Sequence, residues 1–212
     1  VLFWGLQALA LRYLPTGMTA VLIYLQPVLV GLLAWPLLGE RLSVPKVAGL
    51  LLGFSGVVTV SASGLRADVP VNGVLLALSS ALAWALGTVC LKRREHTVAH
   101  AWAVTSQFLV GGVVLTGLGL LVETPSSITW TPMLWVLLAY TGLVGSALAW
   151  ALWFWLVRTG EASRAAAYIF FVPPTAIALG AILLGESVTP LLAVGAALVV
   201  TGIFLVNRHR PA

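Results

Sequence analysis

The sequence predicts an all-α membrane protein, a polytopic bundle of helices that cross the bilayer. Hydrophobic residues make up 60% of the 212 residues and charged residues 8%, whereas soluble domains carry about 25% charged residues. Seven charge-free runs approach or exceed the ~20 residues of a spanning helix, at 13–39, 47–65, 69–91, 97–122, 124–157, 165–185 and 187–207. Their apolar residues are continuous, which excludes a membrane barrel, whose strands alternate polar and apolar positions.

Turn residues and charges divide the chain into eight expected helices, at 1–14, 17–39, 44–62, 71–91, 99–122, 132–157, 164–185 and 189–207. The first uses the short charge-free run at 1–11, which resembles the end of a further span. The signals that separate the helices are, in chain order, Pro15, Glu40, Pro45, Gly64, Pro70, Pro125, Pro132, Gly160, Glu186 and Pro190.

The basic residues indicate orientation. Loops on one side collect nine of the eleven, namely Arg41, Lys46, Lys92, Arg93, Arg94, Arg158, Arg164, Arg208 and Arg210, and Arg12 and Arg66 lie on the other. Basic residues accumulate in cytoplasmic loops, so we expect the first side and the C-terminus to be cytoplasmic. The net charge of +5 is explained in this way, and no nucleic-acid partner is expected. Cys90 is the single cysteine, so no internal disulfide or multi-cysteine metal site is expected.

The sequence repeats itself at an offset of 146 residues. Trp4 falls on Trp150, Arg12 on Arg158 and Ile23 on Ile169; the further matches are Pro27 with Pro173, Leu37-Leu38-Gly39-Glu40 with Leu183-Leu184-Gly185-Glu186, Gly49 with Gly195, Leu52 with Leu198, and Gly56 with Gly202. The helix count places Glu40 on the cytoplasmic side and Glu186 on the opposite side, so the copies are inverted. Inverted repeats are typical of transporters whose site lies near the midplane.

The offset also predicts two domains. Residues 1–65 would hold the last three helices of the first copy, and residues 66–212 a complete second copy of five helices with a short basic tail. Shifted back by 146, the helices in 71–122 would lie before residue 1, which is Val rather than Met. We therefore expect eight spans visible of ten, in a five plus five inverted repeat.

The paired motif of Pro27, Leu38-Gly39-Glu40, Gly49 and Gly56, with its echo at Pro173, Leu184-Gly185-Glu186, Gly195 and Gly202, resembles the EamA-type branch of the drug/metabolite transporter superfamily. The resemblance runs through the whole chain from the family's third helix onward. It implies a ten-helix carrier of the inner (plasma) membrane with both termini cytoplasmic. It also implies transport of small metabolites, often amino acids outward. The family's first two helices contribute to its central cavity.

The two prolines predict local disruption of their helices. Pro27 removes the hydrogen bond to the carbonyl of Ile23, and Pro173 removes that to Ile169. A carbonyl freed at membrane depth needs another partner, which could be a solute amine, a water or a neighbouring hydroxyl. The prolines serve either as packing kinks or as hinges beside a solute site, and their repetition favours the second reading.

The candidate solute-binding residues are polar or aromatic and lie deep within spans, as a cavity requires. The set is Tyr24, Gln26, Pro27, Trp84, Thr88, Gln107, Tyr140, Tyr168, Phe171 and Pro173. Interfacial anchoring is the alternative for membrane aromatic residues. No charged residue lies mid-span, so neutral, zwitterionic or aromatic solutes are expected. Either a coupling carboxylate precedes residue 1 or transport is facilitated. Proton or ion coupling and a homodimer stay open; no cofactor or metal is expected.

Glu40 and Glu186 end their helices, where the helix dipole disfavours a carboxylate. Each is expected to cap the amides of the next helix or to pair with a loop arginine, rather than to contact solute. The glycines at 49, 53, 56, 195 and 202 form stripes of small residues that let membrane helices approach closely.

Two other functions compete with a secondary exporter that works by alternating access. Gly53-Phe54-Ser55-Gly56 matches the G-x-S-G of a rhomboid-type intramembrane protease, but a nucleophilic serine needs a base nearby. The histidines His96, His100 and His209 all lie in or directly beside expected loops or at the terminus, so we expect no enzyme. A channel needs a continuous polar pore, and no span shows a polar stripe.

Overall fold

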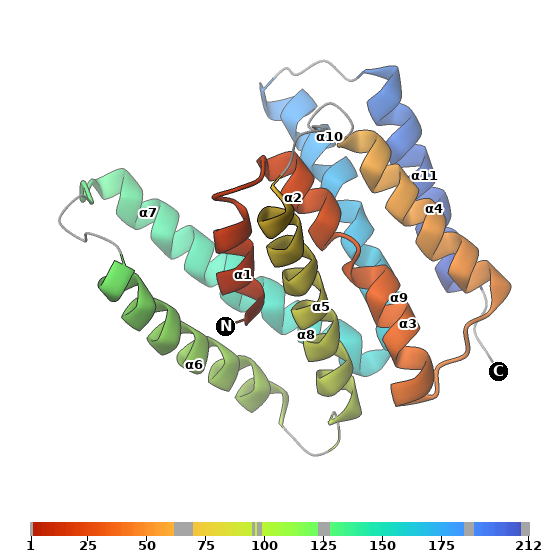
Figure 1. Cartoon of the computed structure of the whole chain (residues 1–212), viewed down its shortest axis with the longest axis horizontal. Helices are drawn as coiled ribbons and strands as arrows, with labels where there is room; N and C mark the ends of the chain where they lie inside the picture. The colour runs from red at the N-terminus through yellow and green to blue at the C-terminus, as the bar shows by residue number, and fades with distance from the viewer. Residues whose placement is uncertain are drawn as a thin grey trace. The chain divides into compact units, whose positions relative to one another are not determined.

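The computed structural model describes residues 2–61, 70–94, 96, 99–122, 128–184 and 189–208, and the regular structure in this part of the chain is helical. Figure 1 shows the helices in chain order. They are α1 (Leu2–Ala10), α2 (Thr16–Ile23), α3 (Gln26–Leu38), α4 (Val44–Val60), α5 (Val71–Arg93), α6 (His100–Val122), α7 (Pro132–Tyr140), η3 (Thr141–Leu148), α8 (Ala149–Thr159), α9 (Ala162–Ala167), η4 (Tyr168–Phe171), α10 (Val172–Leu184) and α11 (Pro190–Arg208).

These elements confirm the all-α prediction of a polytopic membrane protein. Among the described residues, α2 and α3 belong to one span, Thr16–Leu38, and the elements from 132 to 159 and from 162 to 184 each follow without a gap. Counted in this way the elements form eight helical segments, which coincide with the eight expected helices to within a few residues. Among the described residues, five segments are long and apolar enough to span a bilayer: Thr16–Leu38, Val71–Arg93, Ala101–Leu121, Pro132–Thr159 and Pro190–Arg208. The helix Val44–Val60 is apolar but shorter, and α1 ends at Ala10, four residues before its expected end.

One compact unit comprises Arg94–Thr159, with α6, α7, η3 and α8. The expected helix over 132–157 is present as the span Pro132–Thr159, and its middle, Thr141–Leu148, is π-helical rather than α-helical. A π-helix widens the turn to an i to i+5 hydrogen bond and appears where a helix is locally distorted. Gly142 and Gly145 lie in this segment, and glycine favours such departures from regular helix.

The second unit comprises Leu2–Arg93 and Gly160–Ala212. At its centre α5 packs against α1, α2 and α3. The buried residues of α5 are mostly small, among them Gly73, Ala77, Ala81 and Ala85. Small side chains allow membrane helices to approach closely enough for their backbones to pack, so this face of α5 accommodates three neighbours.

The helices α4 and α11 form the most extensive contact in this unit, and Figure 1 shows them side by side. A Cβ built on Gly49 would lie 2.5 Å from the carbonyl oxygen of Gly202, and one on Gly56 would lie 2.7 Å from that of Gly195. Because the low-numbered end of α4 meets the high-numbered end of α11, the two helices run antiparallel. We call this contact the glycine seam; it confirms that these glycines serve helix packing.

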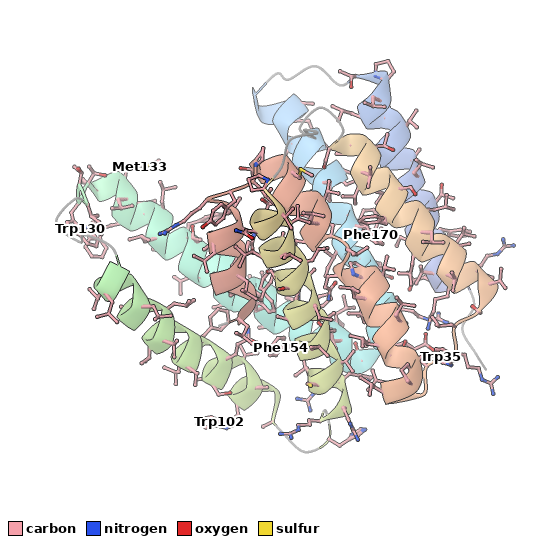
Figure 2. The ribbon with its side chains drawn as sticks, in the orientation of Figure 1. Trp35, Trp102, Trp130, Met133, Phe154 and Phe170 are labelled. Carbon is pink, nitrogen blue, oxygen red and sulfur yellow. The ribbon has the colours of Figure 1, made fainter. Side chains whose placement is uncertain are left out.

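A hydrophobic core adjoins the seam. Its buried members are Val21, Leu50, Val57, Ala167, Phe170, Val199, Ile203 and Val206. The ring of Phe170, labelled in Figure 2, lies against Gly53, where a Cβ would approach within 2.5 Å of a ring carbon. The glycine of α4 therefore makes room for an aromatic ring that follows α9 in the chain.

Candidate functional site

The first expected helix disruption is a break between α2 and α3. Helix α2 ends at Ile23, a turn occupies Tyr24 and Leu25, and α3 begins at Gln26 with Pro27 in its first turn. Proline has no amide hydrogen, so Pro27 fits a first turn, where an amide would have no intrahelical acceptor. The chain therefore starts a new helix here, rather than bending one continuous helix over 17–39 as the sequence suggested.

The second disruption occupies the matching place in the sequence. Helix α9 passes into a 3₁₀ turn, η4, over Tyr168–Phe171, and α10 then begins at Val172 with Pro173 and Pro174 in its first turn. Shifting by 146 residues places η4 on residues 22–25, which end α2 and form the first turn. Each proline therefore follows a local departure from regular α-helix, which is a turn at Tyr24 and Leu25 and a 3₁₀ turn at Tyr168–Phe171.

The two breaks meet the same core. Tyr24 is half-buried and packs against the core cluster that contains Phe170 and Ala167. Beyond the core, the Tyr168 and Phe171 rings are stacked with their centroids 6.4 Å apart. These two side chains are 41% and 39% exposed, so η4 presents an accessible aromatic surface next to a break.

Gln26 and Thr88 form a buried polar contact between α3 and α5. The Gln26 Nε2 donates to Thr88 Oγ1 at 3.3 Å, and the Thr88 hydroxyl donates to the Trp84 carbonyl at 3.0 Å. The Thr88 proton is thus already committed, so its oxygen accepts and the Gln26 amide nitrogen must face it. The Gln26 Oε1 is buried and has no hydrogen-bond partner among the described residues. Both side chains are almost fully enclosed.

The Trp84 side chain lies on the same face of α5 as Thr88, one turn earlier. Its ring centroid is 4.7 Å from that of Phe3. One further turn back, the Ser80 hydroxyl donates to the Phe3 carbonyl at 2.8 Å. The side chains of Ser80, Trp84 and Thr88 thus join α5 to α1 and α3. Sequence reasoning found Trp84 and Thr88 but missed Phe3 and Ser80; the spacing of four residues was the signal for Ser80.

The remaining sequence-predicted site residues differ in burial. Pro27 is buried and Pro173 is half-buried. Gln107 on α6 is half-buried, and Tyr140, 63% exposed, is the last residue of α7 before the π-helical segment. Both belong to the unit Arg94–Thr159. The contacts of the other unit bring together Gln26 with Thr88 and Tyr168 with Phe171.

The turn after α3 directs the Glu40 side chain. Gly39 adopts a left-handed conformation with φ of 70°, and it is the one described residue with positive φ. Glycine adopts this conformation without the steric cost of a Cβ and commonly ends helices in this way. The amides of Gly39 and Glu40 both donate to the Ala34 carbonyl, Glu40 at 3.2 Å. The Leu-Gly-Glu motif therefore stops α3 and places a carboxylate immediately after the stop.

That carboxylate caps α9. Glu40 Oε1 accepts from the Ala162 amide at 2.5 Å, and Oε2 accepts from the Ser163 amide at 3.3 Å and from the Ser163 hydroxyl. A carboxylate at a helix N-terminus satisfies unpaired amides and is favoured by the helix dipole. The expectation that Glu40 caps the next helix is wrong, because the capped helix belongs to a segment about 120 residues away. The matching Glu186 lies outside the described residues.

Lys46, rather than an arginine, neutralises Glu40. Its Nζ lies 3.3 Å from Glu40 Oε2 and 3.0 Å from Glu161 Oε2, and its side chain is 4% exposed. Arg164 completes the network, with Nε 2.5 Å from Glu161 Oε2 and Nη1 3.3 Å from the Asn207 carbonyl of α11. We call these four charged residues, two acidic and two basic, the α9 network.

The surroundings of Glu161 shift the pKa of its carboxyl group. Partial burial by itself raises the pKa of Glu161, but the hydrogen bonds and positive charges of Lys46 and Arg164 outweigh it. The pKa therefore lies below the ordinary value of 4.5. The carboxylate is ionised at neutral pH and balances the enclosed ammonium of Lys46.

Sequence reasoning had no local signal for the α9 network. The shift by 146 places Lys46 on Leu192 and Ser163 on Gly17, so the repeat register predicted neither partner. The accessible Tyr168 and Phe171 rings and the enclosed Gln26 and Thr88 side chains provide apolar contact and uncharged hydrogen bonding. Such groups suit reversible binding of a small solute rather than bond making.

The chain is similar to a known protein family and to individual proteins. The sequence model of the EamA-like transporter family matches residues 1–62 and 71–208. The uncharacterized transporter YvbV of Bacillus subtilis (strain 168) is 44% identical over 211 residues, covering 100% of this chain and 69% of that protein. A probable amino-acid metabolite efflux pump of Escherichia coli (strain K12) is 27% identical, covering 91% of this chain and 67% of that protein.

The fold also matches a solved structure. A crystal structure described only as that of a protein superposes with a TM-score of 0.86, at 24% sequence identity. The superposition covers 97% of this chain and 72% of the other. At this identity the match concerns the fold alone.

Proposed function

Because this chain belongs to the EamA-like transporter family, we propose that it is a secondary carrier that exports small organic solutes by alternating access. Members of this family are multi-pass membrane transporters and not enzymes, so the rhomboid-type protease hypothesis is wrong. Ser55 lies on α4, the helix that forms the glycine seam. The solute, the direction and the mechanism are the parts that we propose.

The proposed architecture is an inverted repeat, with residues 1–65 in one copy and 66–212 in the other. The glycine seam supports it. Gly49 meets Gly202 and Gly56 meets Gly195, and the shift by 146 converts each pair into the other. Two helices that occupy matching places in the repeat and pack antiparallel are what a two-fold axis in the membrane plane requires.

The paired breaks are the observation on which the proposed mechanism mainly rests. The turn at Tyr24 and Leu25 and the 3₁₀ turn Tyr168–Phe171 precede matching prolines and adjoin one core. Transporters with inverted repeats bind solute where discontinuous helices meet, and then expose that site to either face. Hinge motion is absorbed by a few residues at the ends of elements, and these two turns supply such positions.

The residues near the breaks favour solutes with an apolar or aromatic part and no net charge. The accessible Tyr168 and Phe171 rings offer an aromatic surface, and Gln26 and Thr88 offer uncharged hydrogen-bonding groups. Two relatives, from Escherichia coli and Salmonella typhimurium, are described as probable amino-acid metabolite efflux pumps. Neutral amino acids and hydrophobic amines are accordingly the solutes that we expect.

The proposed location is the inner (plasma) membrane with a cytoplasmic C-terminus, which the distribution of nine against two basic residues supports. In this orientation the turn that carries Glu40 faces the cytoplasm. Coupling to protons or ions and assembly into a homodimer are left for experiment to decide.

Transport by the purified chain tests the proposal. Proteoliposomes would be loaded with tritiated phenylalanine, leucine or phenethylamine, and efflux would be compared with that from protein-free vesicles. We expect saturable efflux and exchange against unlabelled solute outside. Efflux no faster than from protein-free vesicles for every solute would count against a carrier, and efflux linear in concentration without exchange would indicate a channel.

A further inference from the structure

We propose that Glu40 is a positioning residue for transport, whose carboxylate in the first copy fixes the placement of the Tyr168–Phe171 turn in the second copy. This inference rests on the proposed function, because it gives that turn a role in solute binding. The inference depends on the hydrogen bonds that Glu40 accepts from Ala162 and Ser163, which lie about 120 residues further along the chain.

Helix α9 depends on Glu40 for its N-terminal cap. Glu161 is the N-cap residue of α9, but its side chain makes no capping hydrogen bond and instead faces Lys46 and Arg164. The Ala162 and Ser163 amides are satisfied by Glu40. These two amides lie in the first turn, where a helix supplies no acceptor of its own, so this cap decides where α9 begins.

The position of α9 is transmitted directly to the break. Ala162, Ser163, Ala165, Ala166 and Ala167 are all buried, and η4 follows without an intervening residue. At its other side α9 is held to the C-terminal end of α11 by the bond from Arg164 to the Asn207 carbonyl. A tightly packed segment transmits a shift at one end rather than absorbing it, so a displaced Ala162 would move Tyr168.

The contact needs a carboxylate rather than an amide. Oε1 accepts one backbone amide, and Oε2 accepts the Ser163 amide, the Ser163 hydroxyl and the Lys46 ammonium. In Glu40→Gln one of the two oxygens becomes an NH₂ group that can only donate. Every partner of the Glu40 oxygens is a donor, so this NH₂ group would have no acceptor. The substitution therefore removes the hydrogen bonds of one oxygen while the shape of the side chain stays nearly the same.

Amide hydrogen exchange of the full chain in detergent tests the positioning step without any solute. In Glu40→Gln we expect exchange in residues 162–171 to be about five-fold faster or more, as for loss of a helix cap. Glu161→Gln is the matched control, because it removes the same charge from the same network but no backbone contact, and its exchange in 162–171 should stay near wild type. Equal exchange in the two variants would overturn the proposal.

Transport kinetics test the consequence for function. With tritiated phenylalanine, Glu40→Gln should raise KM about five-fold, with a smaller change in the maximal rate, whereas Glu161→Gln should leave KM near wild type. A purely stabilising Glu40 would lower the amount of active protein and leave KM unchanged, and that result would refute the positioning role. A wild-type chain that moves no solute would refute the proposed function, while the exchange experiment would still decide the positioning by Glu40.

A milder variant keeps the proposal testable if Glu40→Gln does not fold. Ser163→Ala removes the hydroxyl donor to Glu40 Oε2 and retains both backbone amides. We expect a smaller rise in exchange over 162–171 and a smaller rise in KM than for Glu40→Gln. Wild-type values in both measurements would contradict the proposal as directly as a neutral Glu40→Gln.

Discussion

Substitution of Gly202 by alanine tests the glycine seam most directly. A Cβ at this position would lie 2.5 Å from the backbone nitrogen of Gly53 and 2.6 Å from the carbonyl oxygen of Gly49. Both are backbone atoms of α4, so no side chain can rotate away. Restoring ordinary contact at 3.4 Å requires α4 and α11 to separate locally by about 0.9 Å.

The expected cost follows from this displacement. Overpacking of a close-packed interface costs about 1–3 kcal/mol, and alanine recovers up to ~1 kcal/mol through its higher helix propensity. The net destabilisation should therefore be about 1–2 kcal/mol. For a chain of this size that corresponds to a fall in Tm of about 2–8 °C.

The assay is thermal unfolding of the purified chain in detergent at one fixed scan rate, since membrane proteins often unfold irreversibly. Gly117→Ala on α6 is the matched control, because no described atom lies within 4 Å of the added Cβ. The control should keep or slightly raise Tm through helix propensity. A Gly202→Ala variant as stable as the control would refute the argument that the seam requires glycine.

Three further predictions follow from the contacts described above. Lowering the pH should remove the stability contributed by Glu161: its folded pKa is depressed, so the contribution is present above the unfolded value of about 4.5 and is lost as pH falls through the folded pKa. Tm measured from pH 6 to pH 3 should therefore fall less in Glu161→Gln than in wild type, and parallel curves would contradict this. Thr88→Val should lower the free energy of unfolding by about 1–2 kcal/mol, because it leaves the enclosed Gln26 amide without its acceptor. In a double-mutant cycle, adding Gln26→Met should recover most of this loss. Additive losses of the two substitutions would contradict the contact. Pro27→Ala and Pro173→Ala should each slow solute efflux more than they reduce membrane insertion. Efflux is measured from proteoliposomes and insertion by immunoblot of membranes. Equal losses in the two measurements would mean that the prolines serve folding alone.

The hydrophobic runs and the proline positions of the sequence made much of the fold predictable. Charge-free runs bounded by proline, glycine and charge gave the eight helical segments, because lipid requires long apolar helices whatever their neighbours. The breaks before Pro27 and Pro173 were also predictable in place, since proline excludes an internal hydrogen bond. Their form was not, because a kink and a complete restart of the helix satisfy the same local rule.

Contacts between segments that are distant in the chain could not be predicted from the sequence. The glycines at 49, 56, 195 and 202 indicated close packing, but only the fold pairs Gly49 with Gly202. Likewise, Glu40 was recognised as a structural carboxylate, yet its partners Ala162 and Ser163 follow from topology rather than from spacing. The π-helical segment Thr141–Leu148 also had no distinctive signal, because glycine and serine occur throughout regular membrane helices as well.

Because the glycine seam is symmetric, the packing faces of α4 and α11 carry glycines at the same two places, and each face is self-complementary. A helix carrying glycines at both places would fit a second, oppositely oriented copy of itself, so a polypeptide of half the length could assemble as a pair of identical subunits. In the proposed inverted repeat the two copies share one chain, so the two faces need not stay alike. Gly53 and its counterpart Val199 show the resulting divergence, since one receives the Phe170 ring and the other packs against Gly56.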